Sequence, residues 1–237
     1  MSRFGGGTGV PTLNRNDVHS ISAVYPPLPE QQKIATILLS VDDVIEKTRA
    51  QIDKLKGLKT GMMQELLTKG VGHTEFKHSP VGRIPVEWGV STMQEVLHTV
   101  IDYRGKSPPK SEQGVPLITA KNIRQGYIDV APREYICEEQ YDSWMVRGTP
   151  VEGDIFITTE APLGNVARVP GYKFAIGQRV LALSPGDTIT TDYLLYTMQS
   201  RYFREQLALQ STGSTVAGIK QSTFRKISIP IPPKEDQ

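Results

Sequence analysis

Apolar residues recur at alternating intervals of four and three along residues 30–69, which predicts one long amphipathic helix. Pro29 suits the start of such a helix, and Glu30 places a carboxylate where the helix dipole favours an anion. Gly70 and Gly72 favour termination. Two polar residues, Thr48 and Lys59, interrupt the apolar seam. The seam itself comprises Ile34, Leu38, Val41, Ile45, Ile52, Leu55, Met62 and Leu66.

This seam has the spacing of a coiled coil, held for about five heptads. The sequence contains no other long heptad segment, so we expect the second helix to come from another copy of the chain. The alternative is that the helix packs against the globular part of its own chain. Gly57 and Gly61 count against a rigid rod, because each glycine costs about 1 kcal/mol relative to alanine inside a helix.

From residue 71 onward the pattern changes to short apolar runs separated by Gly, Pro or Asn, which predicts β-strands. Strands are expected at residues 115–119, 127–130, 154–159, 165–169 and 179–183. A helical pattern covers residues 191–209, with Thr191 or Asp192 as its cap. Shorter helices are expected near Val96 and near Gln221. The sequence therefore predicts a mixed α/β (α+β) domain of short strands and helices, joined to one long helix.

The chain also contains an internal repeat. Residues 7–27 resemble residues 213–233 at an offset of 206 (213 minus 7), and both stretches end in two prolines. A slip of one residue then aligns Glu30 and Gln32 with Glu235 and Gln237. Chance similarity is the alternative, but spaced apolar positions match as well as prolines. The expected organisation is a vestigial domain tail at residues 1–28, the helix at 29–70, and a complete domain at 71–237.

Composition narrows the class of protein. The formal net charge is +2, which permits nucleic-acid binding without requiring it. No apolar run approaches the roughly 20 residues that span a bilayer, and the N-terminus lacks the apolar region of a signal peptide. Cys137 is the one cysteine, so no internal disulfide can form. These features predict a cytoplasmic protein without a membrane partner.

Several stretches, in their order, resemble the DNA-specificity subunit of type I restriction-modification systems. VGRIPVEWGVSTMQEV resembles the entry into the target-recognition domain of that family. GVPLITAKNIRQGYID and EGDIFITTEAPLGNVARV resemble its central strand-loop segments, and STGSTVAGIKQSTFRKISIPIPPKEDQ resembles its exit segment. Residues 27–70 resemble its conserved helical region. The resemblance covers nearly the whole chain, although each short motif alone is weak.

The resemblance implies a non-catalytic subunit that reads a split site on double-stranded DNA. Methylase subunits that bind S-adenosylmethionine, and through them restriction subunits that use ATP and Mg²⁺, dock on such a scaffold. Because this chain has one complete recognition domain and one helix, it resembles a half-subunit. We expect a homodimer that reads an inverted repeat with a fixed gap. The alternative is a structural coiled-coil adaptor that binds protein and does not read DNA.

Candidate DNA contacts lie in loops that combine cations, amides and hydroxyls, the groups that bind phosphates and base edges. For the first of these loops a solvated charged loop is an equal alternative. The candidates are Arg104, Lys106 and Lys110; Thr119, Lys121, Asn122, Arg124 and Gln125; Thr158, Thr159 and Glu160; Gln178 and Arg179; and Ser214, Thr215, Lys220 and Gln221.

Other chemistry finds little support in the sequence. His73 and His78 flank Glu75, but no further His or Cys cluster supports a zinc site, so we expect no metal. The chain has no glycine-rich cofactor loop and no Asn-Pro-Pro-aromatic tetrapeptide of the kind that adenine methylases use. We therefore expect neither a catalytic residue nor a cofactor in this chain.

Overall fold

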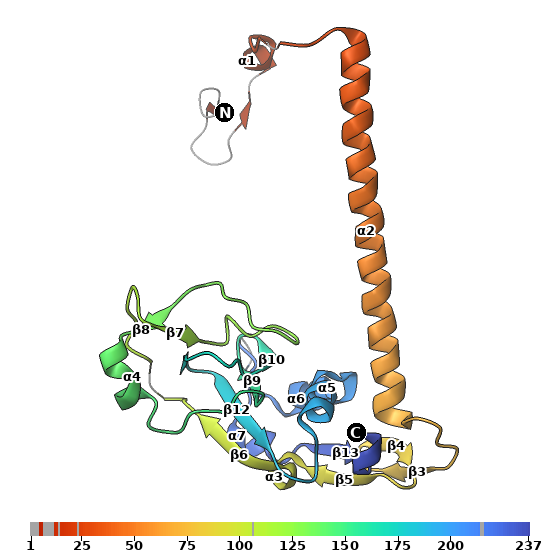
Figure 1. The fold of residues 1–237 in the computed structure, drawn as a ribbon, viewed down its shortest axis with the longest axis vertical. Helices are drawn as coiled ribbons and strands as arrows, with labels where there is room; N and C mark the ends of the chain where they lie inside the picture. Colours follow the sequence, from red (N-terminus) through yellow and green to blue (C-terminus); the bar gives the residue numbers. More distant parts are fainter. Residues whose placement is uncertain (1–4, 7–11, 14, 23, 106, 214–215) are drawn as a thin grey trace. The chain divides into compact units, whose positions relative to one another are not determined.

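The protein is described by a computed structural model that covers residues 5–6, 12–13, 15–22, 24–105, 107–213 and 216–237 (Figure 1). The chain divides into an N-terminal unit, Met1–Leu58, and a C-terminal unit, Lys59–Gln237. The division falls inside the helix α2 (Leu28–Lys69), whereas the boundaries expected from sequence follow element ends. Those boundaries stay a prediction.

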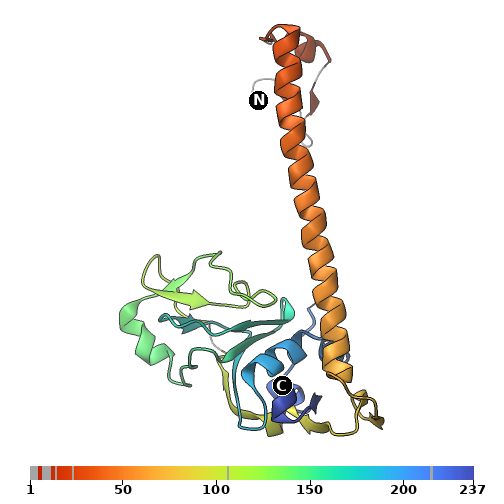
Figure 2. The same cartoon turned by 45° about the vertical axis from the view of Figure 1, so that its right-hand side comes forward.

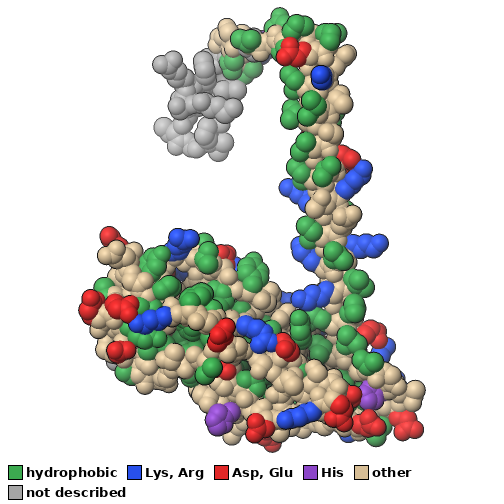
Figure 3. All heavy atoms as spheres, viewed as in Figure 1, with side chains coloured by type: hydrophobic (Ala, Val, Ile, Leu, Met, Phe, Trp, Pro, Cys, Tyr) green, Lys and Arg blue, Asp and Glu red, His purple; other side chains and the backbone are tan. Residues whose placement is uncertain are grey.

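Helix α2 confirms the long helix that the heptad pattern predicts. It contains 42 residues, which corresponds to about 60 Å at 1.5 Å per residue. None of its residues is buried in the single chain. The seam side chains are between 42% and 63% exposed. Hydrophobic side chains therefore follow the helix along its surface (Figure 3).

The last turns of α2 pack within the C-terminal unit, mainly through residues beside the seam and through the polar seam position Lys59. Leu67 packs against the core of this unit, and Met63 and Thr68 line a hollow together with Tyr202. The Lys59 ammonium lies 5.5 Å from the centre of the Tyr196 ring. The seam residues Met62 and Leu66 stay exposed beside this contact. Within the C-terminal unit, this packing thus leaves the seam residues Met62 and Leu66 exposed.

Before α2, the N-terminal unit contains three short elements. Strands β1 (Gly5–Gly6) and β2 (Thr12–Leu13) pair antiparallel, and helix α1 (Arg15–His19) follows. The predicted vestige at residues 1–28 therefore contains ordered elements among the residues that the structure describes.

The C-terminal unit is built on a four-stranded antiparallel sheet in the order β10-β9-β12-β6. Its strands are β6 (Leu97–Asp102), β9 (Ile155–Thr159), β10 (Leu163–Arg168) and β12 (Val180–Pro185). A smaller sheet, β11-β7-β8, comprises β7 (Val115–Ile118), β8 (Tyr135–Ile136) and β11 (Ala175–Ile176). Helix α4 (Glu138–Trp144) follows β8 (Figure 2).

Both faces of the larger sheet are buried, because side chains alternate along its central strands. Ile155 and Ile157 of β9 face one core, together with helices α5 (Thr191–Gln199) and α6 (Arg201–Gln210). Phe156, between them, faces a second core with residues of β7 and β11. The sheet is thus a middle layer between helices and the smaller sheet, which confirms the predicted mixed α+β class.

The entry and exit of this unit lie side by side. The hairpin of β3 (Phe76–Ser79) and β4 (Gly82–Pro85) leads to β5 (Gly89–Thr92) and α3 (Met93–Val96). At the other end of the chain, α7 (Gln221–Phe224) leads to β13 (Ser228–Ile231), which pairs antiparallel with β5. A 3₁₀ turn, Lys234–Asp236, follows. Its Asp236 lies 3.2 Å from His73 Nε2, beside the end of α2.

Two sequence-based expectations are wrong in detail. The strand expected at residues 127–130 does not form, because the Asn122 amide binds the carbonyls of Asp129 and Pro132 and holds this segment as a loop. The helix expected at residues 191–209 is interrupted at Ser200, which is extended and caps α6 through its hydroxyl. Thr190, rather than Thr191 or Asp192, caps α5.

Among the described residues, no helix combines the length and apolar character that crossing a membrane requires. The longest helix, α2, carries lysines, arginines and carboxylates along its length.

The start of α3 generates a test of pH dependence. The Glu95 carboxylate accepts hydrogen bonds from the backbone N–H and hydroxyl of Thr92, which lower the pKa of Glu95 below its usual 4.5. A lowered pKa stabilises the fold above the unfolded value, and this contribution disappears as the pH falls through the folded value. Chemical denaturation should therefore show Glu95→Gln destabilised relative to wild type at about pH 7, with the difference shrinking as the pH falls below about 4. A difference that persists unchanged at the lower pH would contradict this account.

Candidate nucleic-acid interface

The loops on either side of β7 carry three of the predicted cations, Lys110 before the strand and Lys121 and Arg124 after it. Lys121 is 65% exposed, and Lys110 is 54% exposed. Both approach the same oxygen of Glu134, with Nζ–Oε1 distances of 2.7 Å for Lys110 and 3.8 Å for Lys121. Arg124 lies 3.4 Å from Asp129. These cations lie at the surface and keep carboxylate partners, so a phosphate would compete with Glu134 and Asp129 for them.

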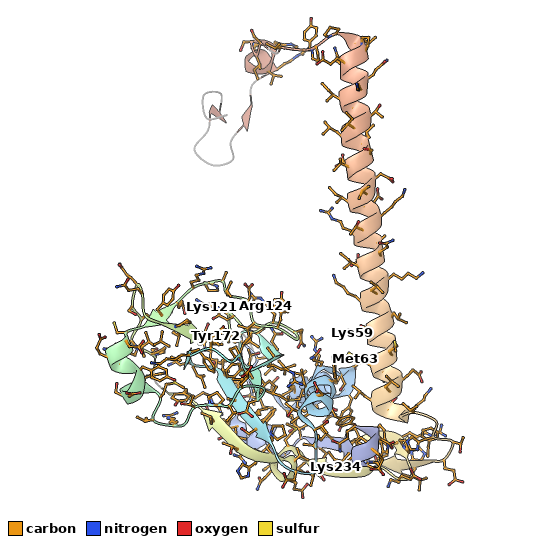
Figure 4. All side chains as sticks on the ribbon, viewed as in Figure 1. Lys59, Met63, Lys121, Arg124, Tyr172 and Lys234 are labelled. Carbon is orange, nitrogen blue, oxygen red and sulfur yellow. The ribbon has the colours of Figure 1, made fainter. Side chains whose placement is uncertain are left out.

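Lys121, Arg124 and Tyr172 project from one edge of the C-terminal unit (Figure 4). Tyr172, in the loop between β10 and β11, is about half exposed and lines one hollow with Asn122. An exposed aromatic ring beside two cations offers a stacking surface next to phosphate-binding groups. Sequence reasoning missed Tyr172, because a single tyrosine in a Pro-Gly turn carries no motif.

The predicted base-reading role of Asn122 is not supported. Asn122 is 5% exposed, and its amide oxygen accepts from the N–H and the hydroxyl of Thr119. Its amide nitrogen donates to the carbonyls of Asp129 and Pro132, each at 3.0 Å. All four hydrogen-bonding positions of the amide are used. Asn122 and Thr119 therefore fix the loop that presents Lys121 and Arg124.

The next predicted group, at the end of β9, divides between core and surface. Thr158 and Thr159 are buried, and the Thr158 hydroxyl accepts from Asn165 N–H at 2.9 Å. Neither threonine is placed to read a base. Glu160 reaches the surface, where it pairs with Arg179 at 2.6 Å. Arg179 has a left-handed backbone, with φ of 67°.

The loop after β6 is held from several directions. Arg104 pairs with Asp102 at 2.7 Å and donates to the carbonyl of Ile219 at 3.1 Å. Arg147, which sequence reasoning missed, donates to the carbonyls of Asp102 and Arg104. Gln178 donates to Ser107 at 3.2 Å. Arg104 is partly exposed, and its guanidinium is engaged by Asp102 and Ile219, which gives it a mainly structural position.

The exit loop meets the same region. Ile219 N–H donates to the Thr159 carbonyl at 3.0 Å, and Gly218 forms a bridge with Glu160. Lys220 is exposed, and Gln221 begins α7. The candidates Lys106, Ser214 and Thr215 lie outside the described residues.

Hydrogen bonds connect these loops into one surface. Asn165 donates through its amide to the carbonyl of Ile123, and Gln125 accepts from Val166 N–H. The loop after β7 is thereby joined to strand β10. Glu160, just before β10, contacts Arg179 and Gly218 of the exit loop. We call the exposed and partly exposed polar side chains of these loops the loop rim. The exposed members are Lys110, Lys121, Gln125, Arg179 and Lys220, and the partly exposed members are Arg124, Glu160 and Gln178.

Comparison with known proteins identifies the family. A family model described as "Type I restriction modification DNA specificity domain" matches residues 1–56 and 85–237. The chain belongs to this family. The predicted family is thereby confirmed, on a match that covers most of the chain and the C-terminal unit from residue 85 to its end.

Relatives in this family carry specificity-subunit names. The chain is 30% identical over 244 residues to the Type I restriction enzyme MjaVIII specificity subunit of Methanocaldococcus jannaschii, covering 98% of this chain and 56% of that protein. It is 29% identical over 232 residues to the putative MjaX specificity subunit of the same organism, covering 95% and 52%. These names agree with the expectation of a specificity component rather than a catalytic one. The chain spans about half the length of both relatives.

Solved structures show the same fold. One is a chain from a study of complex assembly and conformational transition of the type I R-M system, with a TM-score of 0.56 and 24% identity over 97% of this chain. Another is the HsdS subunit from Thermoanaerobacter tengcongensis, with a TM-score of 0.51 and 23% identity over 99% of this chain. This chain covers 54% of each.

The role assigned to Asn122 can be tested by stability. Asn122→Ala removes a buried amide and leaves its four partners unsatisfied, so the free energy of unfolding should fall by about 1–3 kcal/mol. Lys121→Ala, at the adjacent exposed position, should change it by less than about 0.5 kcal/mol. Urea denaturation compares the two variants. Equal, small effects would contradict a structural role for Asn122.

Proposed function

We propose that this chain is the DNA-reading scaffold of a type I restriction-modification complex and acts as a pair of copies. Two α2 helices pair antiparallel through their seams, and each recognition domain reads one half of a split inverted-repeat site. The observation that carries this proposal is the seam itself, which is 42–63% exposed along a helix without a buried residue. A coiled-coil seam of this length is stable in water only when a second helix covers it.

The contact between α2 and the C-terminal unit supports the pairing. Met63 and Leu67 face the domain, whereas the neighbouring seam residues Met62 and Leu66 do not. A helix can therefore hold its own domain and a partner helix at the same time. In the pair, the length of α2 would act as a spacer that sets the gap between the two half-sites.

The loop rim supports DNA as the ligand. Its exposed cations suit phosphates, and Gln125 and Gln178 carry amides of the kind that read base edges. Several rim cations keep carboxylate partners, and the whole chain has a net charge of only +2. Few phosphates would be neutralised, so DNA binding by this chain alone should be weak. Docked methylase subunits would supply the remaining contacts.

The chemistry of the complex would reside in other subunits. We place S-adenosylmethionine on the methylase subunits, and ATP and Mg²⁺ on the restriction subunits that join through them. The sequence of this chain supports that division, because it lacks a glycine-rich cofactor loop and the tetrapeptide that holds a flipped adenine. Its own contribution would be to position DNA and partners.

Pairing through the seam predicts a solution mass close to twice 26.2 kDa. Ile52→Glu places a carboxylate in the middle of the seam, where burial of an unpaired charge is costly, and should convert the dimer to monomer. Ala50→Glu adds the same charge on the opposite side of the helix and should leave the dimer intact. Light scattering at micromolar concentration measures both. A monomeric wild-type chain would refute the pairing.

The loop rim predicts salt-dependent DNA binding. Lys121→Ala combined with Arg124→Ala should weaken binding of random-sequence duplex and reduce the slope of log affinity against log salt by about 1 for each lost phosphate contact. Lys77→Ala, on the β3 hairpin away from the rim, removes one cation and is the control for the loss of a single positive charge. Fluorescence anisotropy over a salt series provides the measurement.

Selection from a pool of random duplexes tests the symmetry of the site. A paired chain should enrich an inverted repeat with a constant gap. Enrichment of an asymmetric split site would contradict the two-fold arrangement. Failure to enrich any sequence, with the rim variants binding like wild type, would favour the alternative of a structural adaptor.

A further inference from the structure

The two copies of the internal repeat adopt the same local structure. In the N-terminal copy Gly6 pairs with Thr12, and in the C-terminal copy Thr212 forms a bridge with Gly218. Both pairs are separated by the same offset of 206 (212 minus 6, and 218 minus 12). Helix α1 begins at Arg15, and its counterpart α7 begins at Gln221, again 206 residues later.

The agreement continues through the proline turn. Gln31 donates from its side chain to the Pro26 carbonyl at 2.7 Å, and Gln237 donates to the Pro232 carbonyl at 3.0 Å. Backbone hydrogen bonds match too, from Glu30 to Pro27 and from Asp236 to Pro233. The equivalent of Gln237 is therefore Gln31. The slip of one residue that the sequence alignment introduced, which equated Gln237 with Gln32, is wrong.

The C-terminal copy of the repeat attaches the end of the chain to the domain. Strand β13 pairs with β5, and the domain binds β13 and its approach through backbone carbonyls as well as through the buried side chains of Ile227 and Ile229. Met93 N–H donates to Ile227, the Tyr202 hydroxyl donates to Ser228, and the Tyr193 hydroxyl donates to Pro230. Contacts of this kind depend on the path of the backbone and not on side-chain identity.

Gln237 completes the attachment. Its amide oxygen accepts from Thr190 N–H at 2.6 Å, at the start of α5, and its amide nitrogen also donates to the Thr188 carbonyl at 3.1 Å. The side chain thus fixes the proline turn against the domain. We call these contacts to Thr188 and Thr190 the glutamine clasp.

The N-terminal copy carries the same groups but exposes them. Ile21 is 52% exposed, whereas its equivalent Ile227 is fully buried. Val18 is 46% exposed, and its equivalent Phe224 is fully buried. For Gln31, the part of the chain that the structure describes offers no counterpart of the glutamine clasp. Among the described residues, the N-terminal copy therefore has the local geometry of the C-terminal copy without its buried contacts.

We infer that the segment of residues 12–32 docks on β5 of a second copy of this chain, in place of residues 218–237 of that copy. Gln31 then forms the glutamine clasp on the partner's Thr188 and Thr190. This inference rests on the proposed pairing of two copies. The docked segment runs directly into α2, so each helix of the pair is attached to a domain at both ends.

The exchange depends on the register of the N-terminal segment on β5 and on its affinity relative to the resident segment. The offset places Ser22 opposite Thr92 and Val24 opposite Val90, with the same backbone acceptors as Ser228 and Pro230. Exchange of like for like has a low cost. The resident segment has the larger apolar residue, Phe224 where the N-terminal copy has Val18, so the resident is favoured in a single chain. Pairing of the helices raises the local concentration of the competing segment and makes the exchange observable.

Pairs of introduced cysteines test the proposed register between the N-terminal segment and β5. In a Cys137→Ser background, Ser22→Cys with Thr92→Cys should form an intermolecular disulfide under mild oxidation, seen as a dimer on a non-reducing gel. Ser228→Cys with Thr92→Cys should link within one chain and serves as the positive control. Ser20→Cys with Thr92→Cys is out of register by two residues and should link several-fold less.

Substitution of the two glutamines tests the competition. Gln237→Ala weakens the resident clasp and should raise the yield of the Ser22–Thr92 link several-fold, whereas Gln31→Ala should lower it. A Ser22–Thr92 link that forms within a single chain, or a yield equal to that of the Ser20 pair, would overturn the inference. If light scattering still reports a dimer in that case, the proposed pairing of the helices survives while the exchange fails. A monomer by light scattering would remove both.

Discussion

The organisation of this protein depends on one unsatisfied interaction, the apolar seam of α2. A helix of 42 residues with no buried side chain lacks the main source of helix stability, because helices in proteins gain most of their stability from packing an apolar face. The seam therefore turns a property of one helix into a requirement for a second one. The contact of Met63 and Leu67 with the domain leaves the seam free to meet that requirement.

In the recognition domain, the main structural requirement is to fix the conformation of long polar loops. Its central sheet is buried on both faces, so the loops are anchored to a tightly packed layer. The buried amide of Asn122 and the partly buried guanidinium of Arg104 then hold the loops through hydrogen bonds to backbone carbonyls. The cost is that several side chains that look suited to DNA are already engaged. What remains at the surface is a smaller set of cations and amides, the loop rim, much of it paired with carboxylates.

The structural repeat connects these two features. The exit segment ties the end of a domain to the start of a helix, through β13, the proline turn and Gln237. The same device stands before α2, with Gln31 in the matching place. A chain built from such units can be closed by pairing with another copy. The chain spans about half the length of the specificity subunits that it resembles.

The sequence by itself determined the elements whose information is local. Heptad spacing predicted α2, alternating apolar runs predicted β7, β9, β10 and β12, and the repeat was visible as spaced apolar positions with prolines. Motif order was sufficient for the family, because it needs no three-dimensional information.

Only the tertiary structure decided which candidate side chains reach the surface. Thr158 and Asn122 have the residue types of base readers, yet hydrogen bonds to Asn165, Asp129 and Pro132 place them inside. No local pattern encodes such partners, since they depend on which loops meet in space. The break at Ser200 and the alignment of Gln31 with Gln237 were likewise fixed by hydrogen bonds that a linear pattern does not contain.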